Sequence, residues 1–383
     1  MATENNNKTL NVPNLRFPEF SGEWTKTKLG DIGTTLIGLT YSPKDVVPSG
    51  GTIVLRSSNI KGGLTDYNDI VRVNKKIKES IITRVDDLLI CARNGSARLI
   101  GKNAILKQED CGHTFGAFMM VYRAQNNKFV HQLLNTKRYY SQVGENLGAR
   151  INQITTSDLN SFEFYFPQTL NEQNKIASML SLLDDRIATQ IKIIEKLESL
   201  IKGLYERLFN IDGAAYIQLG NVAKIQKGQQ INGEELSEIG SYYVMNGGVV
   251  PSGYLEDFNT PANTISISEG GNSCGYVQYN GVPFWSGGHC YTLIEPINSF
   301  NYKYLFHYLK FKEQSIMALR IGSGLPNIQK KDLERFPILN VSKEEQDKMA
   351  CIFDDILDRI ICERQIALKY EEQKKYLLSN LFI

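Results

Sequence analysis

The chain has 383 residues, of which 42% are hydrophobic and 22% are charged, and its 43 basic and 41 acidic side chains leave a net charge of +2. This composition is that of a globular protein long enough for two cored domains, and it excludes a chiefly disordered chain. No segment approaches the roughly 18 consecutive apolar residues of a membrane-spanning helix, and the near-neutral charge neither requires nor excludes nucleic-acid binding.

The chain is expected to begin with a flexible tail over residues 1–12, because this Asn-rich segment has no apolar core and does not match a secretory signal. The six cysteines include no C-x-x-C pair, which favours free thiols in a cytoplasmic protein.

Residues 13–167 form a first module, module 1, of mixed character. Short apolar runs at 53–55, 88–90 and 118–122 predict strands, and the apolar spacing over 129–140 predicts a helix. The module is therefore expected to be α+β, with many surface loops.

Two polar loops of module 1 carry side chains that suit nucleic acids. The first follows the strand at 88–90, and the second precedes the first long helix. Arginine, asparagine, serine and glutamate are the side chains that match base edges and phosphates, whereas glycine, asparagine and proline also occur in loops for backbone reasons alone. The candidate DNA-contacting residues are Arg93, Asn94, Ser96, Arg98, Arg150 and Gln153.

A long helix is predicted over residues 172–209 by a sustained heptad pattern. Leu180, Ile187, Ile194, Ile201 and Leu208 recur every seven residues, and a second line contains Ile176, Leu183, Leu197 and Leu204, with Gln190 as its polar member. A seam sustained over about five heptads favours a coiled coil over an amphipathic helix packed on its own domain.

A second module, module 2 (residues 213–341), follows the same plan. Strands are expected at 242–244, 264–267 and 291–294, and a helix at 302–319. The two corresponding loops supply the candidate DNA-contacting residues Glu269, Asn272, Ser273, Arg320 and Asn327.

The last helix is predicted over 345–382. It aligns with the first helix without a gap at a constant offset of 173 positions, so that Glu345 corresponds to Glu172. Its seam is weaker, because Glu363 and Lys374 occupy seam positions beside Ile356, Ile360 and Leu377. Pairing with the first helix of the same chain gains from a high effective concentration. We therefore expect an intramolecular antiparallel coiled coil with a pseudo-twofold axis. The polar seam residues are either register devices or solvent-facing positions.

The motifs of several enzyme classes are missing from the sequence. No Asn/Asp-Pro-Pro-aromatic segment of a DNA methyltransferase and no G-x-x-x-x-G-K-[ST] loop occurs. The four histidines are scattered, and His289 with Cys274 and Cys290 matches no zinc spacing. We therefore expect neither a catalytic site nor a metal site.

The start of module 1 carries a family resemblance, with Pro13-Asn14-Leu15-Arg16-Phe17-Pro18-Glu19-Phe20 followed by Trp24 and Leu29-Gly30-Asp31. Together with the repeated Glu-Gln-x-Lys-x-Ala (172–177 and 345–350), Asp-Arg-Ile and terminal Leu-Phe, it resembles the specificity subunit of a Type I restriction-modification system.

The resemblance implies two target recognition domains (13–167 and 213–341) and two conserved helical regions (168–212 and 342–383). Each domain would read one half of a bipartite double-stranded DNA site, and the helices would set the spacer and dock two modification subunits. The partner residues would be Leu180, Leu183, Ile187, Ile194, Leu197, Ile201, Ile356, Ile360 and Leu377.

By the same resemblance, the subunit would be non-catalytic and would act in the cytoplasm. The modification subunits would use S-adenosylmethionine to methylate adenine, and ATP-driven restriction subunits would bind through them. S-adenosylmethionine, ATP and Mg²⁺ would therefore be bound by these partner subunits and not by this chain. The alternative is a coiled-coil adaptor that binds proteins and no DNA.

Overall fold

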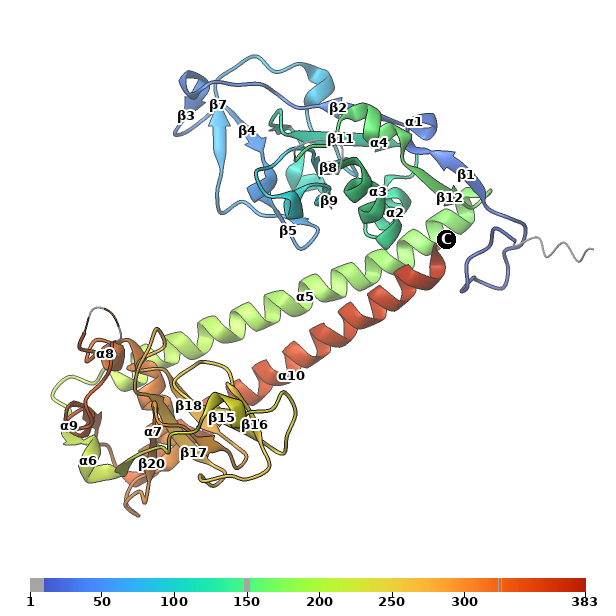
Figure 1. Cartoon of the computed structure of the whole chain (residues 1–383). Helices are drawn as coiled ribbons and strands as arrows, with labels where there is room; N and C mark the ends of the chain where they lie inside the picture. Colours follow the sequence, from blue (N-terminus) through green and yellow to red (C-terminus); the bar gives the residue numbers. More distant parts are fainter. Residues whose placement is uncertain (1–9, 148–151, 323, 325) are drawn as a thin grey trace, which may run out of the picture. The chain divides into compact units, whose positions relative to one another are not determined.

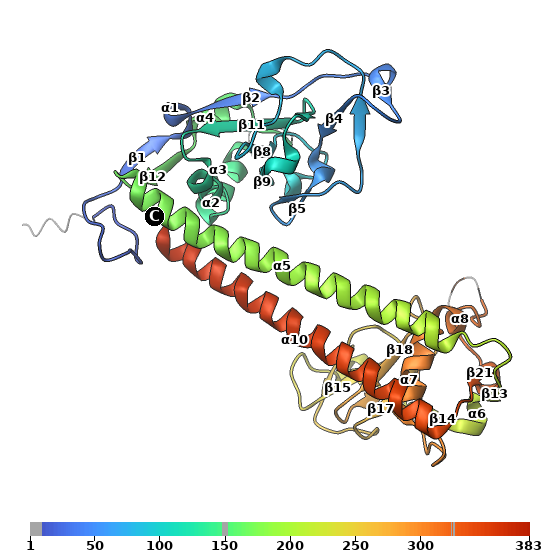
Figure 2. The same ribbon diagram turned by 180° about the vertical axis from the view of Figure 1, so that it is seen from behind.

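The computed structural model describes residues 10–147, 152–322, 324 and 326–383. These residues form two compact units. Unit 1 contains the chain up to Thr189 together with Ile366–Ile383, and unit 2 contains Gln190–Gln365. Each unit combines a body of strands and short helices with parts of two long helices (Figures 1 and 2), so the expected α+β class is confirmed.

An antiparallel sheet with strand order β2-β11-β8-β9 forms the centre of unit 1. Its strands are β2 (Gly33–Ile37), β8 (Leu88–Cys91), β9 (Asn103–Ile105) and β11 (Met119–Ala124). Side chains alternate between its faces, so Leu88 and Ile90 join one hydrophobic cluster, whereas Leu89 and Cys91 join another. Burial on both faces explains why β8 reads as a continuous apolar run.

A second sheet, β10-β4-β7-β3, packs on one face of the central sheet, where Leu55 and Phe115 share a hydrophobic cluster with Leu89. Its strands are β3 (Val46–Val47), β4 (Thr52–Leu55), β7 (Val71–Val73) and β10 (Thr114–Phe115). Two strand pairs complete unit 1: β1 (Thr25–Lys28) with β12 (Glu163–Phe166), and β5 (Ile60–Lys61) with β6 (Leu64–Thr65).

Helices cover the other face of the central sheet. They are α1 (Leu29–Ile32), α2 (Asn127–Leu133), α3 (Lys137–Leu147) and α4 (Thr156–Ser161). The loops of unit 1 also contain 3-10 turns at Pro43–Asp45, Ser57–Asn59, Glu79–Ile81, Ala97–Leu99 and Gln108–Asp110. The single helix predicted over 129–140 is wrong. The chain breaks after Leu133, where the Thr136 hydroxyl donates to the Leu133 carbonyl and accepts from the Tyr139 N–H, so a threonine begins a new helix.

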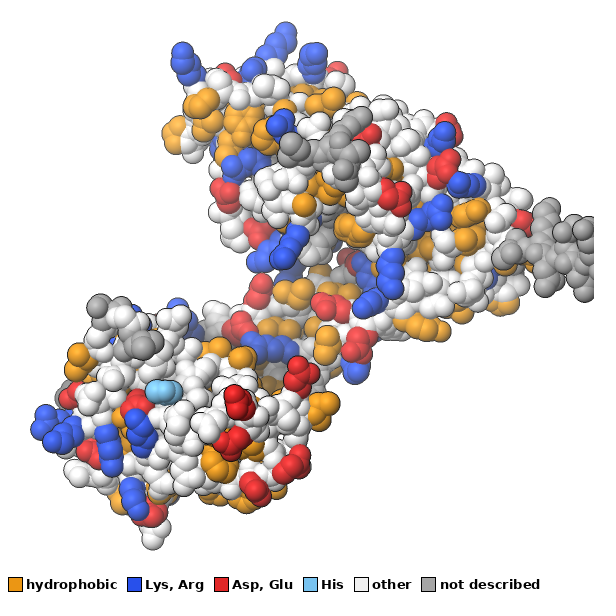
Figure 3. Space-filling view, viewed as in Figure 1, with side chains coloured by type: hydrophobic (Ala, Val, Ile, Leu, Met, Phe, Trp, Pro, Cys, Tyr) orange, Lys and Arg blue, Asp and Glu red, His pale blue; other side chains and the backbone are white. Residues whose placement is uncertain are grey.

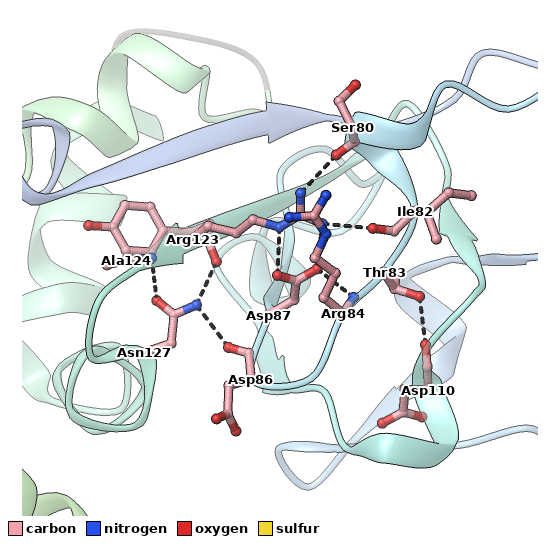
Figure 4. A network of polar contacts seen from close by, with 11 residues as sticks. Ser80, Ile82, Thr83, Arg84, Asp86, Asp87, Asp110, Arg123, Ala124 and Asn127 are labelled. Carbon is pink, nitrogen blue, oxygen red and sulfur yellow. Dashed lines mark hydrogen bonds and ion pairs between the residues drawn. The ribbon is translucent and has the colours of Figure 1, made fainter.

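A network of polar contacts fixes the chain that leads into β8 (Figure 4). Arg123, on β11, forms a two-pronged ion pair with the nearly buried Asp87, with both N···O distances at 2.7 Å. Its guanidinium also donates to the carbonyls of Ser80 and Ile82. The loop before β8 is therefore tied to the neighbouring strand β11, which fixes the point where the chain enters β8.

Unit 2 repeats this plan with the sheet β14-β20-β17-β18. Its strands are β14 (Lys224–Lys227), β17 (Thr264–Ser268), β18 (Val277–Asn280) and β20 (Cys290–Ile294). Beside it lie the sheet β16 (Gly253–Leu255), β15 (Tyr242–Met245) and β19 (Trp285–Ser286), and the pair β13 (Tyr216–Gln218) with β21 (Pro337–Leu339). Asn263 directly precedes β17, and Asp86 lies two residues before β8. Both have positive φ, at 59° and 65°.

The helices of unit 2 are α6 (Leu219–Val222), α7 (Tyr302–Phe311), α8 (Glu313–Met317) and α9 (Lys330–Glu334), with a 3-10 turn at Gly233–Glu235. The continuous helix predicted over 302–319 is also wrong, because Lys312 (φ −87°, ψ 11°) separates α7 from α8. In both modules, apolar periodicity located the helical segment but gave no sign of the break within it.

Two long helices, α5 (Leu170–Phe209) and α10 (Lys343–Leu381), confirm the two predicted helical repeats. In unit 1, the beginning of α5 packs against the end of α10. Ile176, Leu180 and Leu183 share one hydrophobic cluster with Leu377 and Leu381. The two helices therefore run antiparallel there, as predicted.

In unit 2, the end of α5 packs against the beginning of α10. Ile201 and Tyr205 join a cluster that includes Ala350 and Phe353. The other predicted seam residues are at least half-buried, namely Ile187 in unit 1 and Ile194, Leu197, Ile356 and Ile360 in unit 2. The seam therefore holds the chain's own helices together.

The polar seam residues pair across the helices instead of facing solvent. In unit 2, the Gln190 amide donates to the carboxylate of Glu363, and their exposed fractions are 8% and 2%. Glu363 is the repeat counterpart of Gln190, so equivalent residues meet, as a pseudo-twofold relation requires. In unit 1, Lys374 forms an ion pair with Asp184.

The predicted tail falls largely on residues 1–9, which lie outside the described residues. Its described part is held in place, because the Asn11 carbonyl accepts from the Trp24 N–H at 2.8 Å and the Leu15 N–H donates to the Asn380 carbonyl at 2.9 Å. The segment from Leu10 to Trp24 forms a strap over the end of the helix pair in unit 1. Among the described residues, no helix has the length and apolar character needed to cross a membrane.

Candidate nucleic-acid interface

The two polar loops of module 1 meet at the end of β8. Arg93 and Gln153 form an antiparallel bridge, and the Ile154 N–H donates to the Ala92 carbonyl at 2.9 Å. The Asn152 side chain also donates to the Gly95 carbonyl at 3.0 Å. Segments some 60 positions apart in the sequence therefore build one surface.

Module 2 joins its two loops through the same backbone contacts. Gly270 and Asn327 form an antiparallel bridge, and the Ile328 N–H donates to the Glu269 carbonyl at 2.9 Å. The Gly271 N–H donates to the Pro326 carbonyl at 3.0 Å. Each module thus presents a two-loop surface on the same backbone frame, with different side chains.

The described candidate residues of module 1 lie on or beside this surface. Arg93 is exposed, and its guanidinium carbon lies 5.2 Å from the centre of the Phe118 ring. Asn94 is half-buried, donates to the Ser57 hydroxyl at 2.9 Å and accepts from the Ser96 N–H at 3.0 Å. Asn94 therefore shapes the loop through its own hydrogen bonds.

The remaining candidates of module 1 differ in their placement. Gln153 is half-buried in the bridge, whereas Ser96 and Arg98 are exposed on the outer part of the first loop. Arg150 lies outside the described residues.

Glu269 departs from the expectation that it offers its carboxylate on the surface. Only 8% of the residue is exposed, and Oε1 accepts from Lys227 Nζ at 2.6 Å and from the Tyr291 hydroxyl at 3.1 Å. Burial and this carboxylate together raise the pKa of Tyr291. Glu269 therefore acts as an internal acceptor beneath the loop, because a buried carboxylate needs such partners.

The other predicted residues of module 2 are more accessible. Asn272, Arg320 and Asn327 are exposed, and Ser273 is half-buried. Asn327 also forms two backbone hydrogen bonds with Ile321, at 2.8 and 3.0 Å. The segment that follows α8 therefore lies beside the same two-loop surface.

A groove of about 970 Å³ opens beside the two loops of module 1. Arg93 and Asn94 line it, as predicted, but so do Asn152, Arg56 and Phe118, which were not among the predicted residues. The Arg56 guanidinium forms an ion pair with Asp69 at 2.7 Å. Arg56 immediately follows the buried strand β4, so the rule that located the loop after β8 would have found it.

The groove can form hydrogen bonds and apolar contacts with a ligand, but the thiols near these loops are poor nucleophiles. Burial raises the pKa of the Cys91 thiol to about 11, and also that of Cys290 to about 11. Within the described ranges, no group of three or more His, Cys, Asp and Glu side chains is arranged to hold a metal ion. The chemistry of the surface is that of recognition.

The model of the Type I restriction modification DNA specificity domain matches this chain twice, at residues 21–199 and 212–371. A protein of Mycoplasma genitalium named as a type I specificity subunit is 24% identical over 308 residues, which cover 76% of each chain. One of Mycoplasma pneumoniae with a similar name is 37% identical over 122 residues, 31% of this chain and 32% of that protein.

The fold is also similar to a solved structure. The crystal structure of a Type I restriction-modification S subunit from M. genitalium aligns with a TM-score of 0.72 at 20% identity, over 97% of this chain and 99% of that one.

Proposed function

Because this chain belongs to the Type I restriction-modification DNA specificity family, we propose that each of its modules reads one half of a bipartite, asymmetric DNA site. The chain is the component that confers DNA sequence specificity, and catalysis belongs to other components of such a system. The family match disfavours the alternative of an adaptor without DNA binding.

One observation carries the proposal of two independent readers. The bridges Arg93–Gln153 and Gly270–Asn327 join the same two loops in the two modules, yet the side chains at these positions differ. A common backbone frame keeps the reading surface in place, while different side chains select different bases.

We propose that modification subunits dock on the outward faces of α5 and α10. The residues first named as partner residues form the buried seam, so another chain would meet the exposed apolar side chains instead. In unit 1 these are Leu182, Leu368 and Tyr376, and in unit 2 they are Ile191, Leu200, Ile352 and Ile361. Hydrophobic side chains are visible along the helices in Figure 3. These side chains offer apolar surface that a docked subunit would remove from water.

The proposal includes two modification subunits, one for each helical repeat, with restriction subunits bound through them. S-adenosylmethionine, ATP and Mg²⁺ would then bind to those subunits, and the complex would act on cytoplasmic DNA. Basic and acidic side chains are interspersed on the visible face of both units (Figure 3). Such a surface suits a subunit whose partners share the phosphate contacts.

The test is methylation mapping with single-module variants of the chain in complex with its modification subunit. Arg93→Ala should relax recognition in one half-site, and Asn327→Ala in the other, each at a cost of about 1–3 kcal/mol. Arg84→Ala is the matched control, because this exposed arginine lies outside the groove. Both halves changing in either variant would refute the assignment of one module to each half-site.

A further inference from the structure

Phe118 and His289 occupy the same position in the backbone frames of the two modules. The Ala92 N–H donates to the Phe118 carbonyl at 2.9 Å, and the Glu269 N–H donates to the His289 carbonyl at 2.9 Å. Both residues directly precede a central strand, β11 or β20. The residue directly after the buried strand, Ala92 after β8 and Glu269 after β17, therefore makes the same bond in each module.

A second set of backbone bonds fixes the same correspondence from the other side. The Gly38 N–H donates to the Met119 carbonyl at 3.3 Å, and the Gly228 N–H donates to the Cys290 carbonyl at 2.8 Å. Met119 and Cys290 directly follow the two residues in question. Because bonds on both sides agree, the equivalence of Phe118 and His289 follows from the frame, although the sequence around them differs.

Further backbone contacts near Phe118 and His289 are also common to the two modules. The Gly116 N–H donates to the Leu55 carbonyl, and the Gly287 N–H donates to the Met245 carbonyl, both at 2.9 Å. Parallel bridges join Leu39 to Gly116 and Gln229 to Gly287. Three other segments of each module therefore hold this position beside the two-loop surface.

In module 1 the position presents an apolar side chain to the groove. Phe118 is 59% exposed and lines the groove next to Arg93. Covering such a large apolar side chain with a binding partner is energetically favourable, because it removes apolar surface from water. In the DNA major groove, the 5-methyl group of thymine is the apolar feature that phenylalanine can contact, whereas arginine pairs with guanine O6 and N7.

In module 2 the same position presents a hydrogen-bonding side chain. The His289 side chain is 60% exposed, and its Nδ1 lies 3.7 Å from Glu269 Oε2. The other oxygen of this carboxylate is held by Lys227 and Tyr291. At 3.7 Å this approach is too long for a hydrogen bond, so an N–H of the imidazole can be donated to an acceptor on DNA.

We propose that Phe118 and His289 occupy equivalent positions and that each determines which base its module recognises there. Phe118 contacts the 5-methyl group of a thymine in the half-site of module 1, and His289 donates a hydrogen bond to N7 of a purine in the half-site of module 2. This inference rests on the proposed function, since it names the base features that the two reading surfaces select.

The first experiment changes the DNA and leaves the protein unaltered, by removing the 5-methyl group of single thymines. After methylation mapping has given the bipartite sequence, each thymine of the module 1 half-site is replaced in turn by deoxyuridine. Binding by the assembled complex should weaken about fourfold at one thymine, the loss that corresponds to about one buried methyl group. With Phe118→Ala, that replacement should have no further effect, whereas Phe118→Leu should retain part of it.

The second experiment removes the acceptor that His289 is proposed to use. Each purine of the module 2 half-site is replaced by its 7-deaza analogue. One replacement should weaken binding by the unaltered complex but not by the His289→Ala complex. The two variants should act on different half-sites.

Tyr140→Ala is the control for loss of an exposed aromatic side chain, because Tyr140 lies on α3 and is 46% exposed. Thermal unfolding shows whether each variant folds. The inference is overturned if no thymine is sensitive to loss of its methyl group, or if the sensitivity persists in Phe118→Ala. Failure of the proposed function would differ, because the unaltered complex would then bind all DNA sequences equally.

Discussion

The two units secure the ends of the same helix pair in different ways. In unit 1, the strap from the beginning of the chain supplies Arg16 and Trp24, which bind the buried carboxylate of Glu172 at the start of α5. In unit 2, the repeat counterpart Glu345 is exposed and accepts hydrogen bonds from Ser342, capping its own helix. One repeated residue therefore has two roles, depending on whether a neighbouring segment covers it.

The C-terminal ends of the two helical repeats also make different contacts. Phe209, which ends α5, is fully buried, and its ring packs against those of Tyr205, Tyr304, Tyr308, Phe311 and Phe353. Its counterpart Phe382 is 8% exposed and contacts Trp24 and Phe129. A duplicated scaffold thus keeps its backbone frame while each copy builds its own stabilising contacts.

The largest expected effect is that of Phe209→Ala. Loss of this ring should destabilise unit 2 by about 3–5 kcal/mol, because the cluster cannot close over the cavity. Phe382→Ala should cost less, since the penultimate residue of the chain has fewer aromatic neighbours and some exposure. Urea unfolding of the two variants measures both, and an equal loss would contradict the difference inferred between the helix ends.

Glu172→Ala should have the next largest effect, at about 3 kcal/mol, because the Arg16 guanidinium loses its carboxylate partner and the Trp24 indole N–H loses its acceptor. Glu345→Ala should be much milder, since water can replace an exposed cap. Urea unfolding of the two variants gives the comparison. A loss at Glu345 as large as that at Glu172 would show that the strap does not distinguish the two units.

Acidification should weaken unit 1 through His131. Burial lowers the pKa of His131 to about 4 from its ordinary value of 6.5. Between these values the unfolded chain binds a proton that the folded chain does not, so stability is full above pH 6.5 and falls as the pH drops towards 4. The loss should be on the order of 3 kcal/mol.

The control is the buried histidine of unit 2. Burial lowers the pKa of His307, but its hydrogen bond to Asp354 at 2.9 Å opposes the shift. His131→Gln should therefore flatten the dependence of stability on pH more than His307→Gln. If unfolding curves recorded from pH 4 to 7 showed the reverse order, the account of His131 would be wrong.

The smallest effect is expected when both members of the buried polar pair are replaced. Glu363→Leu alone leaves the Gln190 amide without its acceptor, which should cost about 1–3 kcal/mol. Gln190→Leu together with Glu363→Leu should restore stability to within about 1 kcal/mol of the unaltered chain or exceed it. Urea unfolding tests this, and a double variant less stable than the single one would show that the pair contributes net stability.

The sequence allowed much of the fold to be predicted, because the signals are local and repeated. The seven-residue spacing of Leu180, Ile187, Ile194 and Ile201 indicated the paired helices, and the apolar runs located β4, β8, β15 and β17. The breaks at Thr136 and Lys312 were missed, since they depend on side-chain hydrogen bonds and backbone angles that apolar spacing does not encode.

The candidate interface was predicted less completely. Polar residue type selected Arg93 and Gln153, which the fold brings together, but it also selected Glu269, which is buried. Phe118 and His289 were passed over, because exposed apolar residues and scattered histidines have no distinctive pattern along a chain.

The sequence by itself determined the duplication, the antiparallel helix pair and the family, since each depends on residue types recurring at fixed spacing. Only the tertiary structure decided which side chains share a surface. Hydrogen bonds between segments far apart in sequence place Arg93 beside Gln153 and make Phe118 equivalent to His289. Burial then separates residues of the same type, because a carboxylate such as Glu172 or Glu269 acts as an internal acceptor once the fold has removed it from water.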